Sequence, residues 1–300
     1  MDRLQTMSVF VTVAEEASFA AASRRLNMSP PSVTRAVSNL EERLGTRLLH
    51  RTTRSLQLTD AGTRYLEDCR RILSDIEEAD EHASGAHAAP RGLVSVTASV
   101  PFGGMVLAPV LNSLLDRYPD ISLSVMLVDR IVHLMDEGID VAVRIGELPD
   151  STLSAIRVGQ VRRALCASPE YLAKNGHPKT LEDLLEHELI DFTNMAQGGE
   201  WQFSRGGKVE HFKPKARLHV NKADVAISAA IAGRGLTRVL SYMTLGHLKA
   251  GALEFVLEDF EQPAMPVHIV HKETGKTTAR VRAVVDHLVD ALKKSPALYH

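Results

Sequence analysis

The first forty-five residues carry apolar positions at the spacing of helices. The first predicted helix has an apolar face at a 3.6-residue period, made of Leu4, Met7, Val11 and Ala14. Ser18 is a residue type that caps helices, and a short second helix is predicted from it to Leu26. Two short amphipathic helices in succession predict a small helical domain at the start of the chain.

A third helix is predicted in the stretch LNMSPPSVTRAVSNLEERLG, which ends at Gly45. Ser29 is suited to the N-cap, and Pro30 and Pro31 fit the first turn, where the N–H groups have no intrahelical partner. Gly45 is suited to the C-cap. The expected buried stripe consists of Val33, Val37, Leu40 and Leu44. Only a couple of residues separate this helix from the second, which is the connection length of a helix-turn-helix.

The next segment predicts a short hairpin followed by a long helix. Leu56 and Leu58 alternate with polar residues, which indicates a strand, and we expect a two-stranded wing with arginines at its tip. A helix then begins at Thr59 or Asp60. Its apolar positions follow in steps of four and three, as in a coiled coil: Tyr65, Cys69, Ile72, Ile76, Ala79 and Ala83. We expect this stripe to meet a partner helix; packing on its own domain is the alternative.

Strands and helices alternate after the linker HASGAHAAPRG. Strands are expected at 93–100, 121–129, 140–145, 188–192, 235–241 and 267–273, and helices at 105–118, near Met135, at 223–232 and at 279–292. Such alternation predicts open α/β sheets. The expected fold class is an N-terminal all-α winged helix-turn-helix with a long linker helix, followed by an α/β two-lobed, periplasmic-binding-protein-like domain.

The expected boundaries follow these changes of pattern. We expect three parts: residues 1–59 with the helix-turn-helix and the wing, 60–90 with the long helix and the hinge, and 91–300 with the α/β lobes. Within the last, lobe I covers about 91–160 and 266–300, and lobe II covers about 161–265.

Composition restricts the protein class but not the function. The 44% hydrophobic and 24% charged residues are those of an ordinary globular protein. Apolar runs stay far below the roughly 20 residues that span a bilayer, and the start lacks signal-peptide features, so a cytoplasmic location is expected. Cys69 and Cys166 lie far apart, which offers no disulfide framework. Plain apolar cysteines are expected, with a redox role for Cys166 left open.

The net charge of −2 conceals a local reversal of sign. Residues 17–58 contain seven arginines and two acidic residues, whereas residues 59–81 contain eight acidic residues and three arginines. This reversal indicates that the helical unit and the long helix meet different partners.

The outer face of the third helix is the candidate DNA-reading surface. Once the apolar stripe faces inward, Pro31, Thr34, Arg35, Ser38 and Asn39 face outward, with no acidic residue before Glu42. An arginine can donate to guanine or phosphate, and hydroxyl groups can reach base edges. An ordinary solvated face is the alternative. The candidate DNA-binding residues, which include the wing, are Ser29, Pro30, Pro31, Ser32, Thr34, Arg35, Ser38, Arg51, Thr52 and Arg54.

The stretch SFAAASRRLNMSPPSVTRAVSNLEERLGTRLLHRTTRSLQLTDAG resembles the winged helix-turn-helix of LysR-type transcriptional regulators. GLVSVTASVPFGGMVLAPVLNSLLDRYPDISLSVMLVDR and DEGIDVAVRIGELPDSTL resemble the start of the family's effector domain. The resemblance implies that residues 29–39 form the recognition helix and 60–82 the dimerisation helix. Pro30 departs from the family, where many members have a polar residue. Direct readout is therefore expected mainly from Ser32, Thr34 and Arg35.

Candidate effector contacts lie where predicted strands turn into helices. Ser99, Val100, Pro101 and Phe102 follow the first strand of the second domain, a place suited to hold a carboxylate. Arg144 is a candidate counter-ion, with a surface salt bridge as the alternative. The other candidates are Thr193 and Asn194 after a strand, and Asn221 before a helix, where capping is the favoured alternative.

The sequence therefore predicts a DNA-binding transcriptional regulator that binds a dyad operator as a homodimer or homotetramer. Its partners are double-stranded DNA and a small-molecule effector, with a carboxylate as one candidate class. The alternative is a small-molecule binding protein of periplasmic type without a DNA-binding role. No motif of a hydrolase, phosphate-binding loop or dinucleotide site is present, and His268 and His271 fall on opposite faces of a strand. No enzyme activity, cofactor, metal or membrane partner is expected, and the pattern names neither the effector nor the target genes.

Overall fold

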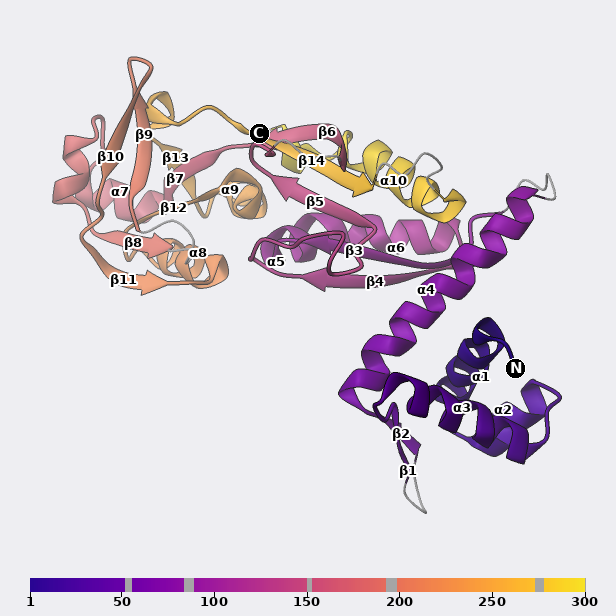
Figure 1. The fold of residues 1–300 in the computed structure, drawn as a ribbon. Coiled ribbons are helices and arrows are strands. Elements are labelled where there is room, and N and C mark those ends of the chain that lie inside the picture. Colours follow the sequence, from indigo (N-terminus) through magenta and orange to yellow (C-terminus); the bar gives the residue numbers. More distant parts are fainter. Residues whose placement is uncertain (52–55, 84–88, 150–152, 193–198, 273–277, 300) are drawn as a thin grey trace. The chain divides into compact units, whose positions relative to one another are not determined.

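The chain divides into two compact units. The computed structural model describes residues 1–51, 56–83, 89–149, 153–192, 199–272 and 278–299 (Figure 1). The first unit is Met1–Leu93 with the short segments Asp120–Ser122 and Thr278–Arg280, and the second unit contains the remainder. No helix in the described segments has both the length and the apolar character that crossing a membrane requires.

Local capping signals define the three N-terminal helices. These are α1 (Arg3–Glu16), α2 (Phe19–Arg25) and α3 (Pro30–Leu44). Ser18 caps α2 by accepting the N–H of Ala21, and Ser29 caps α3 by accepting the N–H of Ser32. Gly45 ends α3 with a φ of 67°, in the left-handed region that glycine tolerates best. The caps expected at Ser18, Ser29 and Gly45 are thus confirmed.

The core of this unit corrects two of the predicted stripes. Val33, Val37 and Leu40 of α3 are buried as expected, but Leu44 is 36% exposed. In α1, Leu4 of the expected face is 41% exposed, whereas Met7 is buried and Val11 and Ala14 pack against the core. The residues of α1 that are buried are Thr6, Met7, Val9, Phe10, Thr12 and Val13. The reason is that α1 packs against three helices, α2, α3 and α4, so it buries a wider face than one stripe.

The wing and the long helix continue the same unit. Strands β1 (Leu49–Arg51) and β2 (Leu56–Leu58) pair antiparallel. Helix α4 (Asp60–Ala83) begins after Thr59, whose hydroxyl accepts the Gly62 N–H at 2.9 Å.

Part of the apolar stripe of α4 packs inside the N-terminal unit. Cys69 is fully buried, and Tyr65 and Ile72 pack against the same core as α1 and α3. Ala79, further along α4, is exposed. Packing on its own domain therefore applies to the first half of the stripe, because that half lies beside α1.

The second unit contains two five-stranded sheets. The first sheet has the order β4-β3-β5-β14-β6. Its elements are β3 (Gly92–Ala98), α5 (Val100–Phe102), the π-helical turn η1 (Gly103–Leu107), α6 (Ala108–Arg117), β4 (Ile121–Leu127), β5 (Val141–Ile145), β6 (Leu153–Val161), β14 (Met265–Lys272), α10 (Ala279–Leu292) and η5 (Pro296–Leu298). Strand β3 runs parallel to β5, while β14 is antiparallel to both β5 and β6, so the sheet is mixed.

Two predicted helices of this part need correction. The helix expected from 105 begins earlier, at Val100, and passes through η1 before α6. The helix expected near Met135 is absent, since the residues around it form turns and Met135 is 66% exposed. Val132, Leu134 and Ile139 are buried there in a small cluster, and Val132 and Leu134 are too closely spaced to share one helical face.

The second sheet has the order β11-β8-β12-β7-β13. Its elements are β7 (Arg163–Ala167), α7 (Pro169–Asn175), η2 (Glu182–Glu186), β8 (Leu189–Phe192), β11 (Ala216–Val220), α8 (Ala223–Ile231), β12 (Leu236–Leu240), η3 (Ser241–Met243), α9 (Leu245–Lys249), β13 (Glu254–Val256) and η4 (Glu258–Phe260). A separate hairpin, β9 (Trp201–Arg205) with β10 (Lys208–Phe212), accompanies it. Because β8 is parallel to both β11 and β12, the carboxyl ends of these three strands lie at one edge of the sheet.

Candidate nucleic-acid interface and effector site

The outward face of α3 carries the predicted DNA-reading residues. Pro31, Arg35 and Asn39 are exposed at four-residue intervals, while Val33 and Val37 between them are buried. Ser29 and Pro30 are also exposed, at the front of the helix. No described residue forms an ion pair with the Arg35 guanidinium. This long cationic side chain is therefore available to a negatively charged or acceptor-rich partner.

The hydroxyl groups at the front of α3 are partly engaged with each other. The Ser29 and Ser32 oxygens lie 2.8 Å apart, and the Ser32 N–H points to the Ser29 oxygen at 3.4 Å. Ser32, Thr34 and Ser38 are half-buried. A contact from Ser32 to a base would therefore compete with its hydrogen bond to Ser29. Arg35 remains the side chain of this face with the longest reach.

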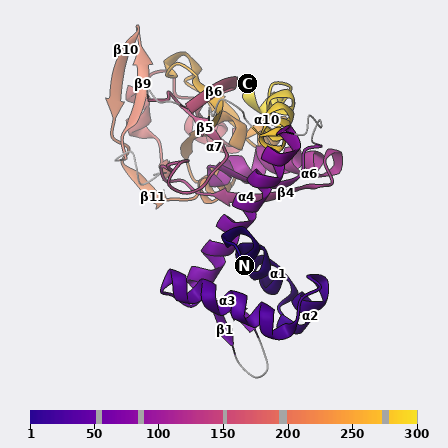
Figure 2. The same ribbon diagram turned by 45° about the vertical axis from the view of Figure 1, so that its right-hand side comes forward.

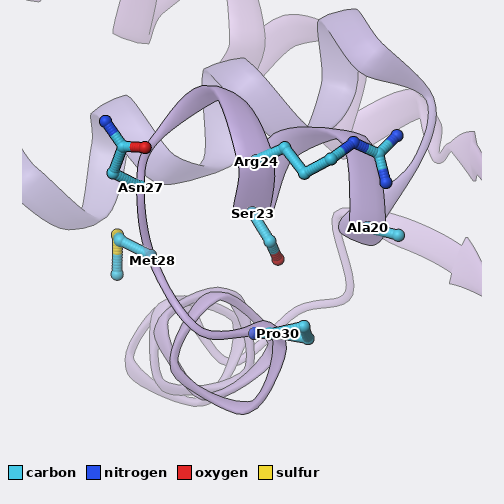
Figure 3. Close-up of a pocket in the computed structure, with 6 residues that line it drawn as sticks. All are labelled: Ala20, Ser23, Arg24, Asn27, Met28 and Pro30. Atoms are coloured by element: carbon cyan, nitrogen blue, oxygen red, sulfur yellow. The ribbon is translucent and has the colours of Figure 1, made fainter.

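A shallow recess lies between α2 and the start of α3 (Figure 3). It measures about 420 Å³, and its lining residues are Ala20, Ser23, Arg24, Asn27, Met28 and Pro30. Asn27 turns the chain with a φ of 51°, and the Met28 N–H then donates to the Ser23 carbonyl at 3.0 Å. The tight turn between the two helices therefore shapes the recess. Arg24 was not among the residues that the sequence singled out.

Three acidic side chains near this surface already have partners. Glu15 and Glu16 of α1 bind the Arg25 guanidinium at 3.1 and 3.0 Å. The Glu41 carboxylate accepts the backbone N–H groups of Leu48 and Leu49, at 2.9 and 3.1 Å, where the wing begins. These pairs leave the cationic character of the front of α3 largely uncancelled.

The wing is only partly described. Arg51 is the last residue of β1. The predicted DNA contacts Thr52 and Arg54 lie outside the described residues.

The expected effector contact at the start of α5 is already made by a protein carboxylate. Ser99 holds the N-cap position without a side-chain cap, and the next N–H, that of Val100, donates to Asp129 Oδ1 at 3.0 Å. Pro101 follows in the first turn, and Phe102 is buried. The site can thus hold a carboxylate, but the carboxylate in place belongs to Asp129, which follows strand β4.

Tyr242 is a second residue of this site that the sequence reasoning missed. It lies in η3, directly after β12, and its ring meets the Phe102 ring edge-on with centroids 5.4 Å apart. Tyr242 is 5% exposed, and its hydroxyl has no hydrogen-bond partner among the described residues. Burial raises the pKa of this hydroxyl, and the nearby Ser99 hydroxyl offsets part of the rise. Its position after the carboxyl end of a strand was the signal that would have identified it.

Of the remaining effector candidates, Arg144 and Asn221 lie in the part of the chain that the structure describes. The Arg144 guanidinium donates to the Val132 carbonyl at 2.9 Å, and burial lowers its pKa. No described carboxylate forms a salt bridge with Arg144, although the Glu137 charge offsets part of the lowering of its pKa. Asn221 is exposed, and its expected capping role is wrong because Lys222 is the N-cap of α8. Thr193 and Asn194 lie outside the described residues.

A carboxylate–imidazole pair stands at the carboxyl ends of β8 and β11. Asp191 is buried and accepts the Trp201 indole N–H at 3.2 Å. Its other oxygen lies 3.1 Å from His219 Nδ1. A carboxylate at Nδ1 fixes the ring orientation and leaves Nε2 for another contact. This pair adds a polar group to the edge where ligands of open α/β sheets bind.

Both cysteine thiols are buried, and burial raises the pKa of Cys69 to about 11 and that of Cys166 to about 12. Because the thiolate is the reactive form, we expect neither thiol of the native protein to react with iodoacetamide at pH 8 within an hour. Both should react after denaturation in guanidinium chloride. Mass spectrometry of the labelled protein measures this; a native protein alkylated at Cys166 would contradict it and restore a redox role.

The two units together define a class of protein, in which a winged helix-turn-helix unit is joined in one chain to an α/β unit of two five-stranded sheets. A model of the lysR family of bacterial regulatory helix-turn-helix proteins matches residues 4–63, and one of the LysR substrate binding domain matches residues 87–293. The chain belongs to the LysR family of DNA-binding transcriptional regulators, whose second domain binds small molecules. The alternative of a binding protein without a DNA-binding role finds no support.

Individual relatives agree with this assignment over nearly the whole chain. The chain is 33% identical over 300 residues to an HTH-type transcriptional repressor of Pseudomonas aeruginosa (strain UCBPP-PA14), which covers 99% of this chain and 95% of the relative. It is 31% identical to the HTH-type transcriptional activator AaeR of Escherichia coli (strain K12), over 97% of this chain and 94% of the relative. The solved structure of CrgA, a LysR-type transcriptional regulator from Neisseria meningitidis, is 31% identical with a TM-score of 0.61, and covers 96% and 98% of the two chains.

Proposed function

We propose that this chain regulates transcription by binding a dyad operator as a homodimer or homotetramer, with α3 in the major groove of each half-site. The observation that carries the proposal is the acid-free exposed face of α3 around Arg35. Two recognition helices related by a two-fold axis would read half-sites separated by whole helical turns. The role is regulatory, and no catalytic step is assigned to any residue.

The proposed contacts keep the assignments that the sequence suggested. Arg35 reads base edges, with Ser32, Thr34 and Ser38 as shorter-range partners, and Ser29, Pro30 and Pro31 set the entry of the helix. Arg51, Thr52 and Arg54 of the wing are proposed to meet the backbone or minor groove. The proposed functional domains are residues 1–59, 60–90 and 91–300, with lobe I at about 91–160 and 266–300 and lobe II at about 161–265.

Selection of DNA from a random-sequence pool tests this proposal without knowledge of the target genes. The purified full-length protein is expected to enrich duplexes that share an inverted repeat with half-site centres about 10 base pairs, or a multiple of that, apart. Enrichment of a single direct element, or no enrichment over several rounds, would overturn the dyad assignment.

For the effector we propose a small molecule bound between lobes I and II. Ser99, Val100, Pro101 and Phe102 are proposed contacts, as are Thr193, Asn194 and Asn221, and Tyr242 adds a hydroxyl donor. Arg144 is proposed as a more distant contact, because its guanidinium already serves the Val132 carbonyl. If the effector is a carboxylate, it must take the Val100 N–H from Asp129. Effector binding would then shift the population between two arrangements of the domain.

Replacement of Asp129 by asparagine separates two effector classes. A carboxylate effector is expected to bind about tenfold more tightly to Asp129→Asn, because a competing like charge is removed. An effector that donates to Asp129, such as an amine, is expected to bind about tenfold less tightly, since a charge-assisted hydrogen bond is weakened. A thermal-shift screen of small carboxylates and amines, followed by calorimetry on both proteins, measures the change.

Unchanged affinity of every identified ligand for Asp129→Asn would remove Asp129 from the effector site. Asp116→Asn, which changes an exposed carboxylate at the end of α6, is the charge-matched control.

A further inference from the structure

We infer that Arg24 binds a backbone phosphate of the DNA at the recess between α2 and α3. The inference rests on the proposed DNA-binding function and adds a residue that neither the sequence pattern nor the proposed contacts include. The recess is lined by side chains of α2, the turn and the first residue of α3, so it borders the reading face directly (Figure 3).

Arg24 and its neighbour Arg25 differ in whether their guanidinium groups already have acidic partners. Arg25 bridges Glu15 and Glu16 of α1, with nitrogen–oxygen distances of 3.1 and 3.0 Å. These contacts neutralise Arg25 and direct it toward α1. Arg24 is exposed, and no described carboxylate forms an ion pair with it. Of the two adjacent guanidinium groups, Arg24 is therefore the one with its charge available.

The surroundings of Arg24 suit a sugar-phosphate chain. A guanidinium binds phosphate oxygens through paired N–H donors. The recess also exposes the Asn27 side chain, whose amide is a further donor, and the apolar surfaces of Ala20, Met28 and Pro30. Those apolar groups can lie against a deoxyribose ring without leaving a buried polar group unpaired.

The position of the recess favours a phosphate over a base edge. In helix-turn-helix proteins the second helix of the motif enters the major groove, while the first crosses the backbone. Arg24 belongs to the first of these helices, α2, and Arg35 to the second, α3. Arg24 therefore contributes to affinity and to the register of the protein on the DNA, whereas Arg35 recognises the base sequence.

Pro30 gains a role from this arrangement. It begins α3 and at the same time lines the recess. Its ring has no N–H, so it supplies apolar surface at the front of the recess and leaves the hydrogen bonds to the phosphate to Arg24. In this arrangement the residue that departs from the family pattern shapes the backbone site and takes no part in base readout.

The test compares Arg24→Ala, Arg24→Lys and Arg25→Ala in the full-length protein. Binding is measured by fluorescence anisotropy on a duplex selected by the wild-type protein and on a scrambled duplex, at several salt concentrations. Arg24→Ala is expected to weaken binding to both duplexes by about tenfold and to leave their affinity ratio unchanged. The slope of log affinity against log salt should shrink by about 0.9 for each protomer. Arg24→Lys should keep most of the slope, and Arg25→Ala should match the wild type.

Neutral phosphates locate the contact. Methylphosphonate is placed at single positions along the selected duplex, and the penalty of each is measured with wild type and Arg24→Ala. One position in each half-site is expected to weaken the wild type and Arg25→Ala but not Arg24→Ala. If Arg24→Ala shows the same penalties and salt slope as Arg25→Ala, the inference fails while the proposed function stands. If the wild-type protein selects no duplex, the proposed function itself fails.

Discussion

Replacing Gly62 by alanine is expected to destabilise the N-terminal unit by roughly 3 kcal/mol or more and to abolish DNA binding. A Cβ at Gly62 would lie 1.9 Å from the Leu48 carbonyl oxygen and 2.8 Å from its carbonyl carbon. That backbone cannot move freely, because the Leu48 carbonyl accepts the Thr59 N–H at 2.9 Å and the Leu48 side chain is buried. The close approach of α4 to the segment entering β1 therefore requires glycine. Urea unfolding followed by circular dichroism measures the loss.

The control for this prediction is Gly246→Ala, in the first turn of α9. No atom lies within 4 Å of a Cβ added there, so the change should leave stability within about 1 kcal/mol of the wild type or raise it slightly. If Gly62→Ala unfolded at the same urea concentration as Gly246→Ala, the tight packing between α4 and the wing would be contradicted.

Replacing Arg35 by alanine is expected to weaken binding to the selected duplex by roughly 30-fold or more for a dimer. A bidentate contact to a base contributes about 1–3 kcal/mol of discrimination, and two half-sites lose it together. Binding to a scrambled duplex should fall much less, so the affinity ratio between the two duplexes collapses. This collapse distinguishes Arg35 from Arg24, which is expected to lower both affinities equally. Anisotropy titrations at one salt concentration measure both ratios.

Arg217→Ala is the charge-matched control for Arg35. The Arg217 side chain is 83% exposed on β11 of the second unit, and its removal should change neither affinity by more than about twofold. An unchanged affinity ratio for Arg35→Ala would show that α3 does not read bases through this side chain.

The sequence was sufficient to predict the helices and strands of the N-terminal unit because their signals are local. Ser18, Ser29 and Gly45 each act on hydrogen bonds within their own turn, and the structure confirms all three. The exposure of Leu4 and Leu44 was not predictable in the same way. It depends on how many neighbours each helix meets, and that number is set by tertiary packing.

The candidate effector site was less predictable because its groups come from distant segments. Asp129 binds the N–H of Val100 across 29 positions of the chain, and Tyr242 meets Phe102 from η3, directly after β12 of the second sheet. Pairs between residues so far apart leave no regular spacing in the sequence from which they could be predicted. Ser99 to Phe102 were found because a strand turns into a helix there. The Asp191–His219 pair was missed, since each residue alone resembles an ordinary polar end of a strand.

Arg24 illustrates the same limit at the DNA interface. The sequence shows two adjacent arginines without a difference between them. Only the ion pairs of Arg25 with Glu15 and Glu16 identify Arg24 as the guanidinium that remains available.

Chemical footprinting on the selected duplex tests the central claim most directly, namely that α3 reads the major groove. Dimethyl sulfate modifies guanine N7 in that groove, and the wild-type protein is predicted to protect guanines in two half-sites separated by whole helical turns. Arg35→Ala, at concentrations that saturate the duplex, is predicted to lose this protection while hydroxyl-radical protection of the backbone persists. Guanine protection that is identical in wild type and Arg35→Ala, or absent from both, would contradict the account.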